Sequence, residues 1–212
     1  MKEFTVTMAL VDFIPVAFFA AASVILMRDL YNKMSKGAFA LFAAGSIDVA
    51  VAGACKALYK LLYASGVCDF ASLSDMFFPV QSIGFLLMGL GVVAMLCHRQ
   101  TEKAAAAVAP AAFKGTMIFV GMMVVGFGAV NVGLSVLGRK LKKGWLASLF
   151  MLAWVCMLAM GYLSTRDFTE AKMNWIAQGV NIVGQGSFLL GAALAHKFGM
   201  AELKLHGEEG NV

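Results

Sequence analysis

Apolar and polar residues alternate along this chain in long blocks. Six apolar runs, each about 20 residues long, are separated by short polar stretches, and a run of that length spans a bilayer as a helix. Only helices and closed barrels satisfy the backbone in lipid, and the runs lack the period-two alternation of barrel strands. The pattern predicts an all-α polytopic membrane helix bundle with helices at Val6–Met27, Gly37–Tyr63, Met76–Cys97, Phe113–Leu137, Trp145–Tyr162 and Trp175–Lys197.

Composition supports this fold class. The chain has 212 residues, of which 61% are hydrophobic and 14% are charged, whereas soluble domains are about half apolar and a quarter charged. No polar stretch is long enough for a soluble catalytic domain, so we expect a single transmembrane domain over residues 1–212. The first run lacks a signal-peptide cleavage pattern and is expected to remain as a span.

The chain also has a weak internal similarity. The third run contains SIGFLLMGLGVVAMLCHR and the sixth contains GQGSFLLGAALAHKF; in both, FLL follows a small residue and precedes a histidine and a base. This predicts a first three-helix unit at 1–100, a linker at 101–114, a second unit at 113–200 and a polar tail at 201–212. Three helices per unit would invert one unit relative to the other, as in many transporters. The alternative is chance similarity between spans rich in Gly, Ala and Leu.

Flanking charges give an orientation. Arg28, Lys33 and Lys36 follow the first run, and cytoplasmic loops are enriched in Lys and Arg. We therefore expect an external N-terminus and a multi-pass protein of the cell membrane, with short loops typical of a bacterial inner membrane. Six crossings, however, would place the basic cluster Arg139–Lys143 outside, against the same rule.

Asp48 is the most informative single residue. It lies in the middle of an apolar run, and the next charge along the chain is Lys56. A carboxylate at that depth costs roughly 2.5–3.5 kcal/mol, so it usually faces the bundle interior or a wet cavity. Asp48 is therefore a candidate cation ligand or proton carrier. The alternative is a structural role in a polar network between helices.

Other polar residues fall at comparable depths when each helical residue advances about 1.5 Å. Asp12 and Lys56 lie near the outer ends of their helices and could meet, although both could also reach the interface. The glutamines could equally be hydrogen-bond partners between helices. The predicted substrate or ion pathway consists of Asp48, Asp12, Lys56, Gln81, Asn131 and Gln185.

Cysteines and histidines do not indicate a metal or cofactor site. The four cysteines are scattered without a CxxC pair, so we interpret them as small apolar packing residues. His98 and His196 end their helices beside a base and are interpreted as interfacial anchors. Walker, HExxH and GxSxG motifs are also missing from the sequence. We expect no cofactor, no metal and no nucleic-acid partner.

These patterns favour an integral membrane transporter or channel for a small solute or ion, with a polar cavity centred on Asp48. One alternative is a non-catalytic membrane sensor or accessory subunit, which would contact a partner membrane subunit, whereas a homo-oligomer would fit the transporter. The other alternative is an intramembrane enzyme acting on a lipid-type substrate, which would need a second group, such as Ser46, beside Asp48. In every case the bilayer is a partner.

Overall fold

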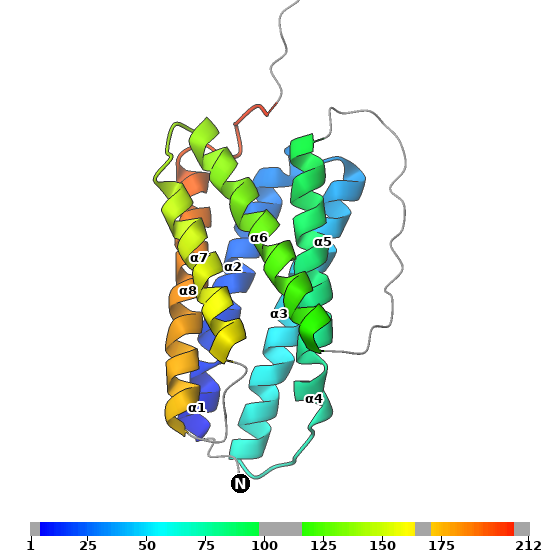
Figure 1. The fold of residues 1–212 in the computed structure, drawn as a ribbon, viewed down its shortest axis with the longest axis vertical. Coiled ribbons are helices and arrows are strands. Elements are labelled where there is room, and N and C mark those ends of the chain that lie inside the picture. Colours follow the sequence, from blue (N-terminus) through cyan, green and yellow to red (C-terminus); the bar gives the residue numbers. More distant parts are fainter. Residues whose placement is uncertain (1–4, 98–115, 164–170, 206–212) are drawn as a thin grey trace, which may run out of the picture.

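The described part of the chain is a bundle of long helices. The computed structural model describes residues 5–97, 116–163 and 171–205, which contain helices and turns but no strand. The long helices lie side by side along the longest axis of the molecule (Figure 1). They are α2 (Phe13–Leu30), α3 (Lys36–Ala64), α5 (Phe77–Cys97), α6 (Thr116–Lys140), α7 (Leu146–Leu163) and α8 (Ala171–Lys197). Shorter elements are α1 (Val6–Val11), η1 (Tyr31–Lys33) and α4 (Ser72–Asp75).

Five segments of the described chain are long and apolar enough to cross a membrane. They are Val6–Lys33, Lys36–Ala64, Ser72–Cys97, Ile118–Lys140 and Leu146–Leu163. The sixth long helix, α8, carries more polar side chains and packs between α2 and α7 over the length of the bundle. The prediction of an all-α helix bundle of a multi-pass membrane protein is therefore confirmed for the described residues, whereas five of the six predicted transmembrane helices meet the length and hydropathy expected of a span.

The first predicted helix is divided in two at Asp12, which ends α1 and precedes α2. Pro15 lies three residues further on and has no N–H to donate to the carbonyl of Val11, four residues before it. At the other end of α1, the hydroxyl of Thr5 accepts a hydrogen bond from the Met8 N–H at 3.2 Å. The break places a carboxylate inside the bundle.

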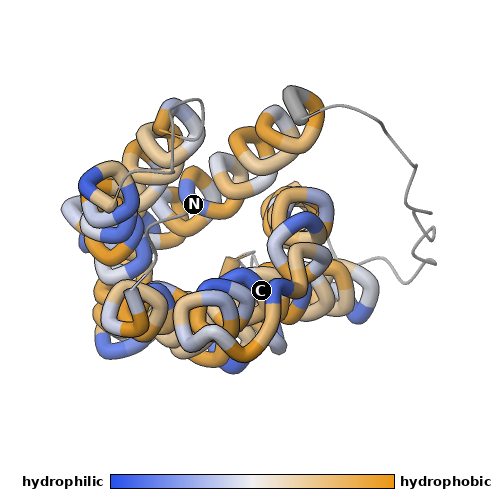
Figure 2. The backbone as a smooth tube through the Cα atoms, turned by 90° about the horizontal axis from the view of Figure 1, so that it is seen from below, coloured by the Kyte–Doolittle hydropathy of each residue, from blue (hydrophilic) through white to orange (hydrophobic). Residues whose placement is uncertain are grey.

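The six long helices form a closed ring. Going around it, the order is α2, α3, α5, α6, α7 and α8, and α8 packs against α2 to complete the circle. Figure 2 shows this arrangement along the bundle axis. Each helix thus has two main neighbours and presents one face to the centre of the ring.

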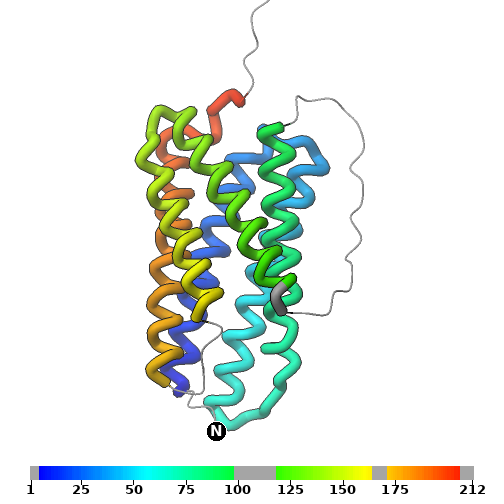
Figure 3. Tube along the Cα trace, in the orientation of Figure 1, coloured from blue at the N-terminus to red at the C-terminus, as the bar shows by residue number. Residues whose placement is uncertain are grey.

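α5 and α6 run in the same direction. A Cβ on Gly126 would lie 2.4 Å from the carbonyl oxygen of Phe85, and a Cβ on Gly133 would lie 2.2 Å from Val92. Residue numbers therefore increase in the same direction along both helices, which is the pattern of parallel packing. Figure 3 shows both helices rising toward the same end of the bundle. The end of α5 and the start of α6 accordingly lie at opposite ends of the bundle.

α8 and α2 also run parallel. The amide of Gln178 reaches the carbonyl of Met8, and His196 reaches Asp29. The remaining neighbours in the ring are antiparallel, as expected for helices joined by short connections. We call the end at which α2 ends and α7 begins the basic end, and the end at which α3 ends and α8 begins the cavity end.

The predicted inversion of the two units is wrong. The first unit (α1 to α5) and the second unit (α6 to α8) have the same orientation, because α6 runs parallel to α5. The prediction assumed that the connection after the third long helix stays on one side of the membrane. The predicted linker at 101–114 lies outside the described residues.

The two units nevertheless repeat the same packing. Three contacts at glycines in the first unit have counterparts on the corresponding helices of the second. The first-unit contacts are Val16–Gly53, Phe42–Gly91 and Asp48–Gly84, and the second-unit contacts are Val120–Gly161, Phe150–Gly191 and Cys156–Gly184. The described helices thus form a parallel repeat about an axis that runs along the bundle.

Labelling of single cysteines tests the parallel direction. In a variant with the native cysteines replaced, Asn32→Cys and Gly144→Cys should react with a membrane-impermeant maleimide from the same side of the membrane. A variant that retains only Cys68, which is exposed at the cavity end, should react from the other side. Reaction of Asn32→Cys and Gly144→Cys from opposite sides would show that α6 runs antiparallel to α5.

Candidate functional site

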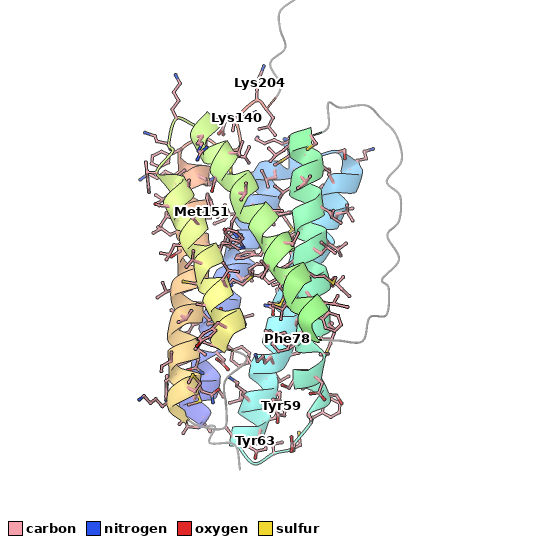
Figure 4. The ribbon with its side chains drawn as sticks, viewed as in Figure 1. Tyr59, Tyr63, Phe78, Lys140, Met151 and Lys204 are labelled. Atoms are coloured by element: carbon pink, nitrogen blue, oxygen red, sulfur yellow. The ribbon has the colours of Figure 1, made fainter. Side chains whose placement is uncertain are left out.

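A cavity of about 400 Å³ lies at the centre of the ring, in the half nearer the cavity end. All six long helices contribute side chains to its wall, so it lies between the two units. Figure 4 labels two lining residues, Tyr59 and Phe78, and shows them far from Lys140 and Lys204 at the basic end. Its volume is within the range of small-molecule sites, about 300–1,000 Å³.

A layer of phenylalanines separates the cavity from the basic end. Phe19 and Phe85 line the cavity, and their rings lie 5.9 Å apart between centroids. Behind them, Phe127 lies 4.7 Å from Phe85, and Phe188 lies 5.3 Å from Phe127. These four residues come from α2, α5, α6 and α8 and are at most 3% exposed. They close the centre of the ring where the two units meet.

Asp12 and Lys60 form an ion pair on the cavity wall. The Lys60 Nζ lies 2.6 Å from the Asp12 Oδ2, and the two side chains are 11% and 15% exposed. The break before α2 places the carboxylate opposite the last turns of α3. The pair links two helices of the first unit and offsets part of the cost of desolvating each charge.

Lys56 lies one helical turn before Lys60 on α3 and also lines the cavity. Its Nζ lies 3.9 Å from the ring centroid of Phe77 and 5.7 Å from that of Phe78. An aromatic face stabilises an ammonium group but does not accept its hydrogen bonds as a carboxylate would. Among the described residues, no carboxylate lies within ion-pair distance of Lys56.

Buried amide groups also line the wall. Gln81 comes from α5, and Gln178 and Gln185 come from α8. Their side-chain carbonyl oxygens are buried and accept no hydrogen bond from a described residue. The Gln178 Nε2 donates to the carbonyl of Met8 at 2.8 Å, so its carbonyl oxygen is left for another donor. Such groups are costly unless a ligand or water satisfies them.

Four of the predicted pathway residues lie together: Asp12, Lys56, Gln81 and Gln185 line the cavity. Asp48 does not line it. Asp48 lies where α3 packs against α5, within 3.1 Å of a Cβ built on Gly84. It makes no hydrogen bond or ion pair with a described residue.

Asn131 also lies away from the cavity. It is fully buried in α6, and its Nδ2 donates to the Phe127 carbonyl at 2.8 Å, one turn earlier. Because α6 runs opposite to the predicted direction, Asn131 lies beyond the phenylalanine layer toward the basic end. The part of α6 that lines the cavity is Val120, Met123 and Val124.

The residues predicted from the sequence did not include Lys60, although it lines the cavity. The available signal was its spacing of four residues from Lys56, which places both lysines on one helical face. Sequence reasoning also missed Asp29, whose side chain is fully buried at the basic end. Little in the sequence indicates that Asp29 is buried, because it follows Arg28 at the end of a helix, where charged side chains are usually solvated.

Asp29 belongs to a second polar cluster, which holds the basic end together. The His196 Nδ1 lies 2.9 and 3.0 Å from the two carboxylate oxygens of Asp29, and the Arg28 guanidinium lies 2.6 Å from the His196 Nε2. Since arginine can only donate, Nε2 accepts and the Nδ1–H donates to Asp29. Lys33 adds a hydrogen bond to the Ala201 carbonyl at 2.5 Å, which ties the chain after α8 to η1.

The polar side chains of the cavity wall include an ammonium, an ion pair, amides and the hydroxyl groups of Tyr59 and Ser74. Such groups can recognise charge and hydrogen-bonding groups. Within the described ranges, no group of three His, Cys, Asp or Glu side chains is placed to hold a metal ion. The cavity therefore has the composition of a small-molecule site, largely apolar with a few polar groups.

Known proteins offer no independent guide to this site. The chain matches no protein-family model, no curated protein and no solved structure. The functional argument consequently depends on the cavity and on the arrangement of helices around it.

A double-mutant cycle tests the Asp12–Lys60 pair. Asp12→Ala and Lys60→Met should each lower the free energy of unfolding in detergent, and the double variant should lose less than the sum. The pair is neither fully exposed nor fully buried, so we expect a coupling of about 1–3 kcal/mol. Lys172→Met, an exposed lysine on α8, is the control. Additive losses would show that the two charges do not interact.

Proposed function

We propose that this protein is a membrane transporter or channel for a small solute, and that the cavity at the centre of the ring is its binding site. The observation that supports this most is the set of buried, unsatisfied amide oxygens on the wall of a cavity in a membrane helix bundle. Polar groups inside a membrane domain are costly and usually mark a solute pathway.

The arrangement of the units supports transport rather than binding alone. Parallel repeats related by an axis along the membrane normal occur among transporters, with the binding site between the units. Here the units meet at two parallel interfaces, α5 with α6 and α8 with α2. Movement of one unit against the other at these interfaces would separate the phenylalanine layer and open the cavity toward the basic end.

The charge distribution supports an orientation. Basic residues gather at one end, on or near η1, the connection after α6 and the end of α8: Arg28, Lys33, Lys36, Arg139, Lys140, Lys142, Lys143, Lys197 and Lys204. By the positive-inside rule this end is cytoplasmic, so the N-terminus and the cavity face outward. The parallel direction of α6 removes the conflict in the sequence prediction, because the cluster Arg139–Lys143 now lies with the others. The same proposal places the protein in a cell membrane, bacterial or otherwise.

The proposed pathway is centred on Lys56 and Gln185 rather than on Asp48, which does not line the cavity. An intramembrane enzyme with Asp48 as a catalytic residue is not supported, because no described serine, histidine or lysine forms a hydrogen bond with Asp48. A sensor would use the same cavity without moving its ligand across the membrane, and the experiment below separates it from a transporter.

Liposome swelling tests transport. Proteoliposomes would be mixed with glycerol, sorbitol, gluconate or glutamate, and light scattering would follow solute entry. At least one solute should enter faster than into protein-free liposomes. Gly161→Phe places a ring in the cavity wall and should slow this entry by about tenfold or more. Gly121→Phe, on an exposed part of α6 with no atom within 4 Å of its Cβ, should not.

Two results would contradict the proposal. One is entry of every tested solute at the rate of protein-free liposomes. The other is equal entry through Gly161→Phe and the unsubstituted protein, which would show that the solute does not pass through the cavity.

A further inference from the structure

Three side chains with a formal charge line the cavity: Asp12, Lys56 and Lys60. Asp12 contributes one negative charge and the two lysines one positive charge each, which leaves one net positive charge on the described wall. The other titratable side chains of the wall, Tyr59 and Cys156, are formally neutral. The cavity is therefore electrostatically suited to an anion.

The position of Lys56 points to where that anion would bind. Asp12 is already engaged by Lys60 at 2.6 Å. The ammonium of Lys56 instead lies over the Phe77 ring, and none of its hydrogen bonds goes to a described residue. A partly buried ammonium is stabilised strongly by a carboxylate or phosphate that accepts these hydrogen bonds.

The amide side chains of the cavity wall provide a second set of groups that could recognise the ligand. The carbonyl oxygens of Gln81, Gln178 and Gln185 are buried without a donor. Oxygens of this kind accept hydrogen bonds from hydroxyl or amide N–H groups of a ligand. A bare inorganic anion would leave them unsatisfied, whereas an organic anion with such donors would satisfy both sets of groups.

Lys56 and two of the three glutamines come from different units, whereas Gln81 lies on α5 in the same unit as Lys56. Lys56 belongs to α3 in the first unit, whereas Gln178 and Gln185 belong to α8 in the second. A ligand that contacts both would bridge the interface between units at which movement is proposed. Its binding energy would then depend on how the units are arranged, which is the requirement for a ligand to shift a conformational equilibrium.

We infer that the cavity binds a small organic anion, with its acidic group on Lys56 and its hydroxyl or amide donors on the glutamines of α5 and α8. This inference rests on the proposed function for the site but adds the class of ligand. The acidic group could belong to a free organic acid or to the headgroup of an anionic lipid, since both present the same chemistry.

Equilibrium binding tests the inference on purified full-length protein in neutral detergent. Gluconate and sorbitol form a matched pair, because they share a polyol chain and differ in the carboxylate. Gluconate should bind at least about tenfold more tightly than sorbitol, since it alone pairs with the ammonium. Lys56→Met retains an apolar stem of similar length and should remove this preference. Lys172→Met, a lysine outside the cavity, should retain it.

A lipid arm separates the two sources of the acidic group. Phosphatidylglycerol that binds in competition with gluconate, and no longer binds Lys56→Met, would support the same anion site with a headgroup as its occupant. Equal affinity for gluconate and sorbitol, or unchanged gluconate binding in Lys56→Met, would overturn the inference. So would failure of both gluconate and phosphatidylglycerol to bind.

The outcomes are distinguishable from those of the transport experiment. Entry of sorbitol that is blocked by Gly161→Phe but unaffected by Lys56→Met would support transport and contradict the anion site. Binding of gluconate through Lys56 without entry of any solute would support the anion site and contradict transport.

Discussion

The close parallel contact between α5 and α6 is the constraint on which the rest of this structure depends. A Cβ on Gly126 would lie 2.4 Å from the Phe85 carbonyl, and one on Gly89 would lie 2.6 Å from the Gly126 carbonyl. Only glycine lets the two backbones approach this closely. Because the helices run in the same direction, the second unit repeats the orientation of the first. The ring closes through a second parallel interface, between α8 and α2.

The cavity follows from this arrangement. Two similar units that meet about an axis along the bundle leave a central space, and the side chains there decide what fills it. Toward the basic end, buried phenylalanines pack against one another in this space. Toward the cavity end, the first unit contributes charges at Asp12 and Lys56, and the second contributes amides at Gln178 and Gln185. The units are therefore alike in packing but different in chemistry where they face the ligand site.

The sequence was sufficient to predict the six long helices, because the hydrophobic length of a span is a strong signal. It was insufficient for their direction, because an apolar pattern is the same when read from either end of the membrane. The similarity between SIGFLLMG and GQGSFLLG suggested a repeat, but its FLL motifs are three residues out of register with the glycine contacts, which match Gly84 with Gly184 and Gly91 with Gly191. The orientation of the repeat depended on a connection that carries no such signal.

The prediction of the site was limited because the rotation of each helix about its own axis was not known from the sequence. Lys56 follows Asp48 by eight residues, which leaves about 80° between them on a helix of 3.6 residues per turn. That angle is enough to place Lys56 in the cavity and Asp48 against Gly84. In a soluble helix, the apolar stripe identifies the face that turns toward the core and so predicts the rotation of the helix about its axis. In a membrane helix, the faces toward lipid and toward protein are both apolar, so the pattern does not predict this rotation. Asp12 was easier to assign to the cavity. It lies three residues before Pro15 in the first span, where few other polar residues could have taken that role.

Disulfide cross-linking of α5 to α6 tests the central claim most directly. In a variant with the native cysteines replaced, Val92→Cys and Gly133→Cys would be introduced together, since a Cβ at position 133 lies 3.7 Å from the Cβ of Val92. This separation suits a disulfide, whose Cβ atoms are about 3.5–4.5 Å apart. The parallel arrangement predicts rapid oxidation in membranes, detected as a linked peptide by mass spectrometry. Absence of that link, together with rapid oxidation of a second variant that carries Val92→Cys and Val120→Cys, would show antiparallel helices and contradict the account.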